Sequence, residues 1–168
     1  MGDPEGIGPE ITRKALFACL SEFNICHPER SEGSQQEQPH FIVIGNKKIL
    51  GRLPFSVSVV DIPYKTAGEG SLKFLDRAIS LIKEGVADAL VTAPLSKERV
   101  SQYAKNFVGH TEYLAQAFTV KNFDMMFVAG NSCLTIVTRH VPLKEVPKLI
   151  TQKAVYDSIA LMAITLKK

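Results

Sequence analysis

The chain has 168 residues, 45% of them apolar, and a formal net charge of +3. This length predicts one domain of ordinary size with enough apolar material for a core. The mild charge falls short of the concentrated basic surface of a nucleic-acid-binding protein, and the lack of tryptophan argues against platforms that stack bases.

The cysteines and the amino-terminal residues predict where the protein is found. Cys19, Cys26 and Cys133 have no paired spacing, and their odd number favours buried or partly buried thiols in a reducing compartment. The sequence has no apolar run of membrane-spanning length, and Met1–Pro4 does not resemble the start of a signal peptide. We therefore expect a cytoplasmic protein.

Short β-branched runs alternate with stretches of helical periodicity along the chain. Strands are predicted over 41–44, 57–62, 87–92, 125–129 and 134–138, and helices over 70–85, 111–118 and 155–166. The alternation indicates an α/β fold with a mostly parallel sheet flanked by helices. We expect residues 1–168 to form one such domain, and an incomplete one.

Two segments depart from the pattern of a complete α/β domain. The glycine-rich turn at Gly2–Pro9 leads into a helix, but no strand precedes it, although such turns normally follow the strand that positions them. We expect this start to correspond to an internal methionine of a longer protein. Residues 26–38 are polar and charged, and are predicted to be a flexible insertion.

The first two candidate functional segments contain glycine and lysine. Gly6 and Gly8 allow close approach of the backbone to a ligand, and Pro9 suits the first turn of a helix whose amides can face an anion. Lys97 follows a predicted strand, where open α/β sheets bind ligands, and can hold a phosphate as a point charge. A structural turn and a solvated lysine are the alternatives.

The other two candidate segments contain histidine. His110 and Thr111 can both donate hydrogen bonds to an oxygen-rich substrate, although Thr111 can equally cap a helix. His140 is expected at the end of a strand before a proline turn, where an imidazole can bind a metal or carry a proton. One histidine does not make a metal site, which usually needs about three protein ligands.

Taken in order, these segments resemble the 4-hydroxythreonine-4-phosphate dehydrogenase family. The resemblance rests on MGDPEGIGPE, ALVTAPLSKE, GHTEYLA, a Met-Met strand and TRHVPLKEVP, and it extends to about Ile150 apart from 26–38. It implies an isocitrate/isopropylmalate dehydrogenase-like fold and a homodimer with active sites at the subunit interface. It also implies that NAD oxidises 4-phosphooxy-L-threonine to a β-keto acid, which decarboxylates to 3-amino-2-oxopropyl phosphate during pyridoxal phosphate biosynthesis.

The resemblance also implies roles for three residues. His110 and Thr111 match the family's substrate-contacting pair, and His140 matches the first of three metal-binding histidines. The metal would be zinc, magnesium, manganese or cobalt, a choice that one histidine does not fix. A divalent cation beside the substrate hydroxyl lowers its pKa and stabilises the oxyanion from which hydride departs.

The departures from the family pattern suggest that the chain carries only part of the enzyme. Family members are roughly twice as long, and their N-P-H and H-D-Q segments, which hold the other two metal histidines, do not follow His140 here. Most NAD contacts are expected in that further polypeptide, so this chain alone should bind the metal weakly. Three alternatives stay open: a threonate or erythronate 4-phosphate dehydrogenase, a non-catalytic remnant, and a binder of phosphorylated metabolites.

Overall fold

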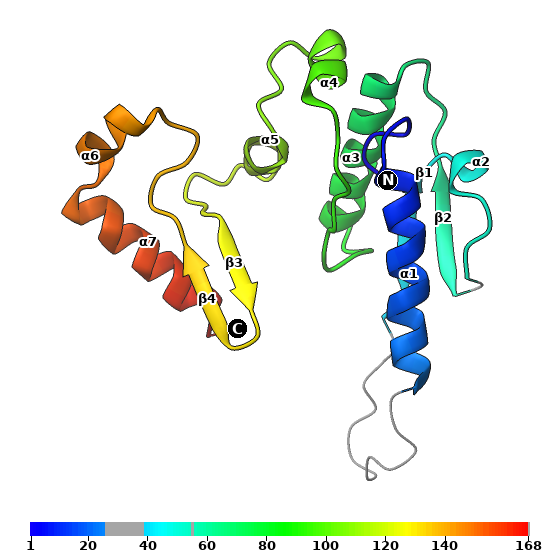
Figure 1. Ribbon diagram of the computed structural model, residues 1–168, viewed down its shortest axis with the longest axis horizontal. Coiled ribbons are helices and arrows are strands. Elements are labelled where there is room, and N and C mark those ends of the chain that lie inside the picture. Colours follow the sequence, from blue (N-terminus) through cyan, green and yellow to red (C-terminus); the bar gives the residue numbers. More distant parts are fainter. Residues whose placement is uncertain (26–38, 55, 168) are drawn as a thin grey trace. The chain divides into compact units, whose positions relative to one another are not determined.

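The computed structural model describes residues 1–25, 39–54 and 56–167. The chain divides into two compact units, Met1–Tyr113 and Leu114–Lys168, each of which has its own sheet (Figure 1). The polar insertion predicted at 26–38 lies outside the described residues. Within the described residues, no helix combines the length and apolar character that crossing a bilayer requires.

The first unit is built on two parallel strands. Its elements are α1 (Gly8–Ile25), β1 (Phe41–Gly45), α2 (Lys47–Leu50), β2 (Val57–Asp61), α3 (Ala67–Lys83), α4 (Lys97–Tyr103) and the start of α5 (His110–Ala117). The register of the two strands runs from Phe41 opposite Val57 to Gly45 opposite Asp61. The strands predicted at 41–44 and 57–62 are therefore confirmed.

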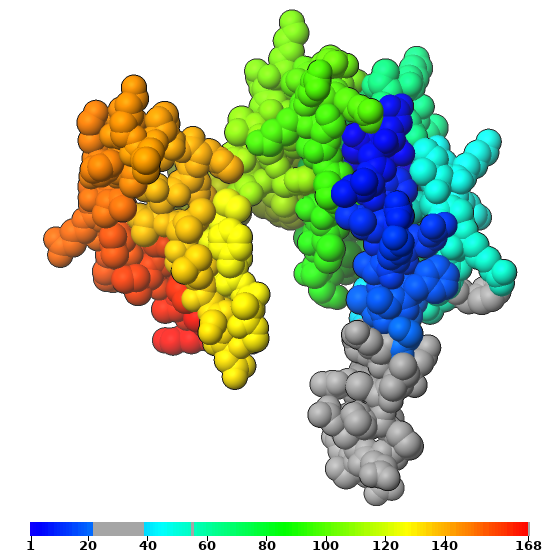
Figure 2. Space-filling view, viewed as in Figure 1, coloured from blue at the N-terminus to red at the C-terminus, as the bar shows by residue number. Residues whose placement is uncertain are grey.

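Helices cover both faces of this small sheet, because successive side chains of β1 point to opposite faces. Ile44 packs with Phe74 and other residues of α3, whereas Val43 packs with Leu16 of α1 and with Leu50 of α2. Figure 2 shows α1, in blue, on the visible face of this unit. The result is a three-layer α/β/α arrangement, as the alternating sequence pattern predicts.

Side-chain caps fix where the helices of this unit begin. Thr66 Oγ1 accepts a hydrogen bond from Glu69 N, and α3 therefore starts three residues earlier than predicted. Gly85 has a φ of +70°, a conformation that favours glycine and stops the helix where expected. Ser96 caps α4 in the same way by accepting from Arg99 N. Helix α4 was not predicted from the sequence.

The prediction of a strand over 87–92 is wrong. These residues pair with no other strand among those the structure describes, although Ala87 and Leu90 pack against the cluster around Ile44 and Phe74. A β-branched run forms a strand only where a neighbouring backbone accepts its hydrogen bonds. The parallel sheet of the described residues consequently has two strands.

The second unit contains an antiparallel hairpin and a helix. Its elements are β3 (Met126–Ala129), β4 (Ser132–Thr135), the 3-10 helix η1 (Leu143–Glu145), α6 (Val146–Leu149) and α7 (Gln152–Thr165). Two neighbouring strands and a carboxyl-terminal helix are confirmed. The prediction of a mostly parallel sheet is wrong for this unit, whose two strands are antiparallel.

The second strand of this hairpin ends earlier than predicted. β4 stops at Thr135, whereas the sequence predicts a strand to Thr138. Arg139 donates to the Phe123 carbonyl and lies 3.1 Å from Asp124 Oδ1. Ser158 of α7 donates to the other oxygen of Asp124 at 2.7 Å. These contacts direct the segment that follows Thr135 toward Asp124 in place of extending the ladder.

Candidate functional site

The glycine-rich turn is bound to the segment that leads into α4. Asp3 N donates to the Pro94 carbonyl at 2.9 Å. Gly2 has a φ of +70°, and a Cβ added there would collide with the carbonyl oxygens of Ala93 and Pro94. Only glycine therefore allows the two segments to approach this closely.

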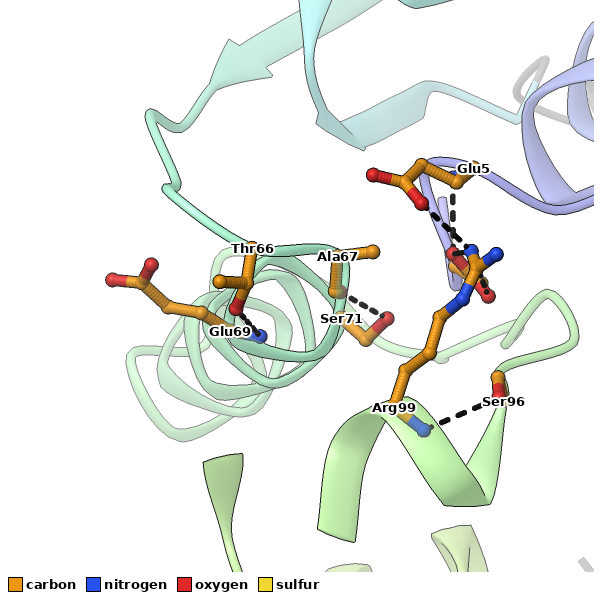
Figure 3. A network of polar contacts seen from close by, with 8 residues as sticks. Glu5, Thr66, Ala67, Glu69, Ser71, Ser96 and Arg99 are labelled. Atoms are coloured by element: carbon orange, nitrogen blue, oxygen red, sulfur yellow. Dashed lines mark hydrogen bonds and ion pairs between the residues drawn. The ribbon is translucent and has the colours of Figure 1, made fainter. Parts of the chain in front are cut away.

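An ion pair reinforces this junction (Figure 3). Arg99 Nη1 lies 3.1 Å from both carboxylate oxygens of Asp3 and 3.1 Å from Glu5 Oε2. Asp3 is only 5% exposed, and its Oδ1 also accepts from Glu5 N at 2.9 Å. The buried carboxylate thus has both oxygens occupied, as its desolvation requires.

Helix α3 provides the support on which Arg99 is placed. Gly68 lies so close to the Arg99 backbone that any Cβ would collide with its carbonyl group. Ser71 Oγ donates to the Ala67 carbonyl within the helix, so this buried hydroxyl is satisfied (Figure 3). The small residues of α3 therefore let α4 pack closely and hold Arg99 toward the turn.

A lysine and a histidine lie close together beside Gly109. A Cβ added at Gly109 would lie 3.8 Å from Lys97 Nζ and 3.3 Å from Glu112 Oε2. Burial lowers the pKa of His110 below 6.5, and the positive charge of Lys97 lowers this pKa further. Both effects favour the neutral imidazole, which can both donate and accept a hydrogen bond.

Helix α5, which carries this histidine, is anchored to α3. Tyr113 Oη donates to Asp76 Oδ1 at 2.5 Å. Burial, together with this bond, raises the pKa of Tyr113 to about 12. Thr111 is half-buried in the first turn of α5, next to His110. The anchored helix fixes the direction in which both side chains leave it.

Three of the four candidate segments are therefore brought together in the first unit. Contacts of Arg99 join Gly2–Pro9 to the α4 segment, and Lys97 of that segment lies near enough to His110 to lower its pKa. Arg99 was not identified as a functional candidate from the sequence. One feature of the sequence could have indicated it: Ser96 is a capping residue, which predicts a helix start and hence a fixed position for Arg99.

His140 belongs to the second unit, and its setting differs from the prediction. It lies on an exposed bend beyond Thr135, where β4 ends, and not at the end of a strand. Its φ of +52° is uncommon for a residue other than glycine. Nowhere in the part of the chain that the structure describes do three His, Cys, Asp or Glu side chains gather to hold a metal. These residues alone do not fit a metal centre.

A cavity of about 310 Å³ lies elsewhere in the first unit. It is lined by Pro4, Glu5, Gly6, Pro9, Glu10, Arg13, Ile49 and Leu50. It does not include His110 or Lys97, and two carboxylates and one guanidinium line it. We therefore place the candidate site at Lys97, His110 and Thr111.

This geometry defines an α/β protein in which a lysine, a histidine and a threonine lie near one another beside Gly109, with the Glu112 carboxylate also close by. A family model described as "Pyridoxal phosphate biosynthetic protein PdxA" matches residues 7–168. The chain belongs to this family.

Individual relatives agree with this assignment. A 4-hydroxythreonine-4-phosphate dehydrogenase of Sulfurihydrogenibium sp. (strain YO3AOP1) is 27% identical over 191 residues, which cover 96% of this chain and 55% of the relative. A D-threonate 4-phosphate dehydrogenase of Bordetella bronchiseptica is 28% identical over 179 residues, covering 86% of this chain and 47% of the relative. The chain thus spans about half the length of the curated relatives it matches.

Solved structures show the same fold. A crystal structure of a 4-hydroxythreonine-4-phosphate dehydrogenase from Burkholderia phymatum superimposes with a TM-score of 0.75 at 27% identity, over 100% of this chain and 57% of that one. The enzyme of this name from Klebsiella pneumoniae gives a TM-score of 0.77 at 24% identity, over 99% and 56%. The α/β class predicted from the sequence is confirmed.

Proposed function

We propose that this chain forms part of a dehydrogenase that oxidises 4-phosphooxy-L-threonine with NAD, and that it supplies substrate contacts. The observation that carries the proposal is the position of Lys97 beside Gly109 and His110, in a chain of this family. The product would be a β-keto acid that decarboxylates to 3-amino-2-oxopropyl phosphate.

The residues of this chain would bind and orient the substrate. Lys97 would supply positive charge to an anionic group, and the neutral imidazole of His110 with the Thr111 hydroxyl would hydrogen-bond its oxygens. His110 and Thr111 are half-buried, which strengthens such bonds because fewer water molecules compete for them, whereas Lys97 is exposed. Binding energy from a phosphate remote from the reacting carbon can orient that carbon.

A second candidate substrate is D-threonate 4-phosphate. The Bordetella relative named for this compound is as similar to the chain as the relative named for 4-hydroxythreonine 4-phosphate. The two substrates differ in a hydroxyl group that replaces the amine. None of the residues assigned above distinguishes these groups, so the proposal includes both substrates.

Other expectations from the resemblance are part of this proposal. They are NAD as oxidant, His140 as one ligand of a divalent zinc, magnesium, manganese or cobalt ion, an isocitrate/isopropylmalate dehydrogenase-like fold, a homodimer and a cytoplasmic location. The exposed apolar side chains of Phe127, Val128 and Leu134 in the second unit are consistent with a subunit interface. Because the described residues give one imidazole, no step is assigned to the metal.

Calorimetric titration tests the proposed contacts. The chain is titrated with 4-phosphooxy-L-threonine and, separately, with D-threonate 4-phosphate. A lost hydrogen bond to a charged ligand costs about 1.5–3 kcal/mol, so H110A and T111A should each weaken binding roughly 10- to 100-fold. K105A, which removes an exposed lysine of the same segment, is the matched control and should leave affinity unchanged. Unchanged binding by H110A would contradict the assignment.

A further inference from the structure

Phe107 packs against two aromatic rings in the first turn of α5. Its ring centroid lies 6.5 Å from that of His110, at an interplanar angle of 80°, and 5.6 Å from that of Tyr113, at 50°. Both separations fall within the range of about 4.5–7 Å that aromatic pairs prefer, and a nearly perpendicular arrangement is one of the favoured geometries. Phe107 therefore holds the imidazole and the phenol in one aromatic cluster.

The segment that joins α4 to α5 presents Phe107 to this cluster. Phe107 N donates to the Ala104 carbonyl at 3.2 Å, which closes a turn just after α4. Phe107 is half-buried, whereas its neighbours Asn106 and Val108 are exposed. In the part of the chain that the structure describes, no other aromatic ring pairs with His110. The environment of the imidazole thus depends on this one side chain.

Tyr113 supports Phe107 from α5, and Asp76 supports Tyr113 from α3. The Tyr113 hydroxyl donates to Asp76 Oδ1 at 2.5 Å, a length typical of a hydrogen bond to a charged carboxylate. Burial and this bond raise the pKa of Tyr113 to about 12, so the phenol keeps the donated proton at neutral pH. Among the described residues, it is the only hydrogen bond that joins residues 110–113 to α3. Leu75 and Ala78, buried in the core, keep Asp76 in place.

The orientation of its ring decides which hydrogen bonds His110 can make. An imidazole donates and accepts through two nitrogens that lie on different sides of one plane, so turning the ring moves both groups. The second side-chain torsion of a free histidine has a broad distribution, and no single orientation is strongly preferred. Packing against Phe107 restricts this torsion before any ligand arrives. Less freedom is then lost when a ligand binds.

We propose that Phe107 is a positioning residue of the substrate site: its ring sets the orientation of the His110 imidazole, and Asp76, acting through Tyr113, holds that ring in place. The inference rests on the function proposed above, in which His110 contacts the substrate. It adds to the site three side chains that touch no substrate themselves. They increase affinity because they restrict the imidazole in advance.

NMR of the chain without ligand tests the positioning directly. F107L keeps an apolar side chain but removes the ring current, so it should shift the imidazole proton resonances of His110. Y113F loosens the support and should shift them too, whereas Y103F, which alters an exposed tyrosine of α4, should not. The resonances of His40, in the same unit, are the internal reference. Unmoved His110 resonances in F107L or in Y113F would overturn the proposal.

Calorimetric titration with 4-phosphooxy-L-threonine tests the consequence for binding. F107L and D76A should each weaken binding roughly three- to tenfold. D76N should retain most of the affinity, because its amide oxygen can still accept from Tyr113. In an H110A background, F107L and D76A should have no further effect, since the imidazole that they position is gone. Equal weakening in both backgrounds would overturn the proposal, because these residues would then act on the fold in general.

The two measurements separate this proposal from the proposed function. If H110A binds the compound as well as the unsubstituted chain does, the substrate contact fails, and the NMR shifts still decide whether Phe107 orients the imidazole. If H110A weakens binding and F107L does not, the substrate contact stands and the positioning role is wrong.

Discussion

Arg99 Nη1 lies 3.1 Å from both carboxylate oxygens of Asp3, a residue 96 positions earlier in the chain. The two side chains differ in exposure, 42% for Arg99 against 8% for Asp3. The pair therefore combines a solvated cation with a carboxylate that is largely removed from water. Losing Arg99 should leave that carboxylate short of its main counter-charge.

Neutralising this pair should destabilise the first unit. We expect D3N and R99M each to lower the free energy of unfolding by about 1–3 kcal/mol, with a coupling energy of about 1–2 kcal/mol in the double mutant. Methionine preserves the apolar stem of Arg99, so the change reports the charge. Urea unfolding of the four chains gives these values.

The exposed pair of Glu10 and Lys14 provides the control. Their side chains are 57% and 71% exposed, and such pairs are worth about 0.2–1 kcal/mol. The E10Q, K14M and double-mutant cycle should give a coupling energy below that of Asp3 and Arg99. Equal coupling energies in the two cycles would show that burial of Asp3 does not strengthen its interaction with Arg99.

The sequence predicts elements well where the pattern is local. The continuous apolar run of β1 reflects burial of both its faces, and the periodicity of α3 reflects burial of one face; the sequence records both directly. It fails for 87–92, because a strand also needs a partner backbone, and composition does not show whether one is present. It fails for Arg99 because a contact across 96 positions leaves no local pattern.

The candidate site, like the fold, was predicted from the sequence only where a local motif marks it. His110 and Thr111 were identified by a short motif, and the structure adds the position of Lys97, which depends on how α4 packs against α3. His140 was predicted on a strand, because Leu134–Thr138 is β-branched. The ion pair of Arg139 with Asp124 ends the strand before it reaches that histidine.

Removing the charge of Lys97 should change the titration of His110. Burial and the Lys97 cation both lower the His110 pKa below 6.5, so K97Q should raise it toward that value without restoring it fully. NMR titration of the imidazole resonances measures the shift. K105Q is the control and should leave the pKa as it is. An unchanged pKa in K97Q would remove Lys97 from the site.

The lowered pKa of His110 makes the free energy of unfolding depend on pH. The folded pKa of His110 is lower than that of the unfolded chain, so the unfolded state binds more protons between the two values. The contribution to stability is therefore intact above pH 6.5 and is lost as the pH falls through the folded pKa. H110Q should reduce this acid sensitivity, as measured by urea unfolding across that pH range.

Tyr113 should titrate at unusually high pH. Its pKa is raised to about 12, so the stability that it contributes is complete below the unfolded value near 10 and is lost as the pH rises toward 12. Ultraviolet titration should show a phenol that titrates near pH 12, which Y113F removes, while Tyr64, whose pKa is also raised by burial and by Glu5 and Asp3, keeps its own late titration. Y156F, which replaces an exposed tyrosine of α7, should leave that late phenol in place.

The amino group of Met1 should make the chain less stable in mild acid. Burial lowers its pKa from 8.0 to about 6, so the unfolded chain binds the proton more tightly between these values. Stability should rise by roughly 2 kcal/mol from pH 6 to pH 8 through this group. Acetylation of a chain that retains Met1 should remove this rise, and urea unfolding at both pH values checks it.

Substitutions of His140 can separate the strain of its backbone from the role of its imidazole. At a φ of +52° a residue with a Cβ is strained by about 1–2 kcal/mol, whereas glycine is not, and asparagine tolerates this region best among the others. Urea unfolding should therefore rank H140G and H140N as more stable than H140A. All three variants lack the imidazole equally. Any weak binding of zinc at His140 should thus be lost in all three alike, as measured by calorimetry. A stability order that placed alanine first would refute the backbone argument, and zinc binding retained by all three would remove His140 from the proposed ligand set.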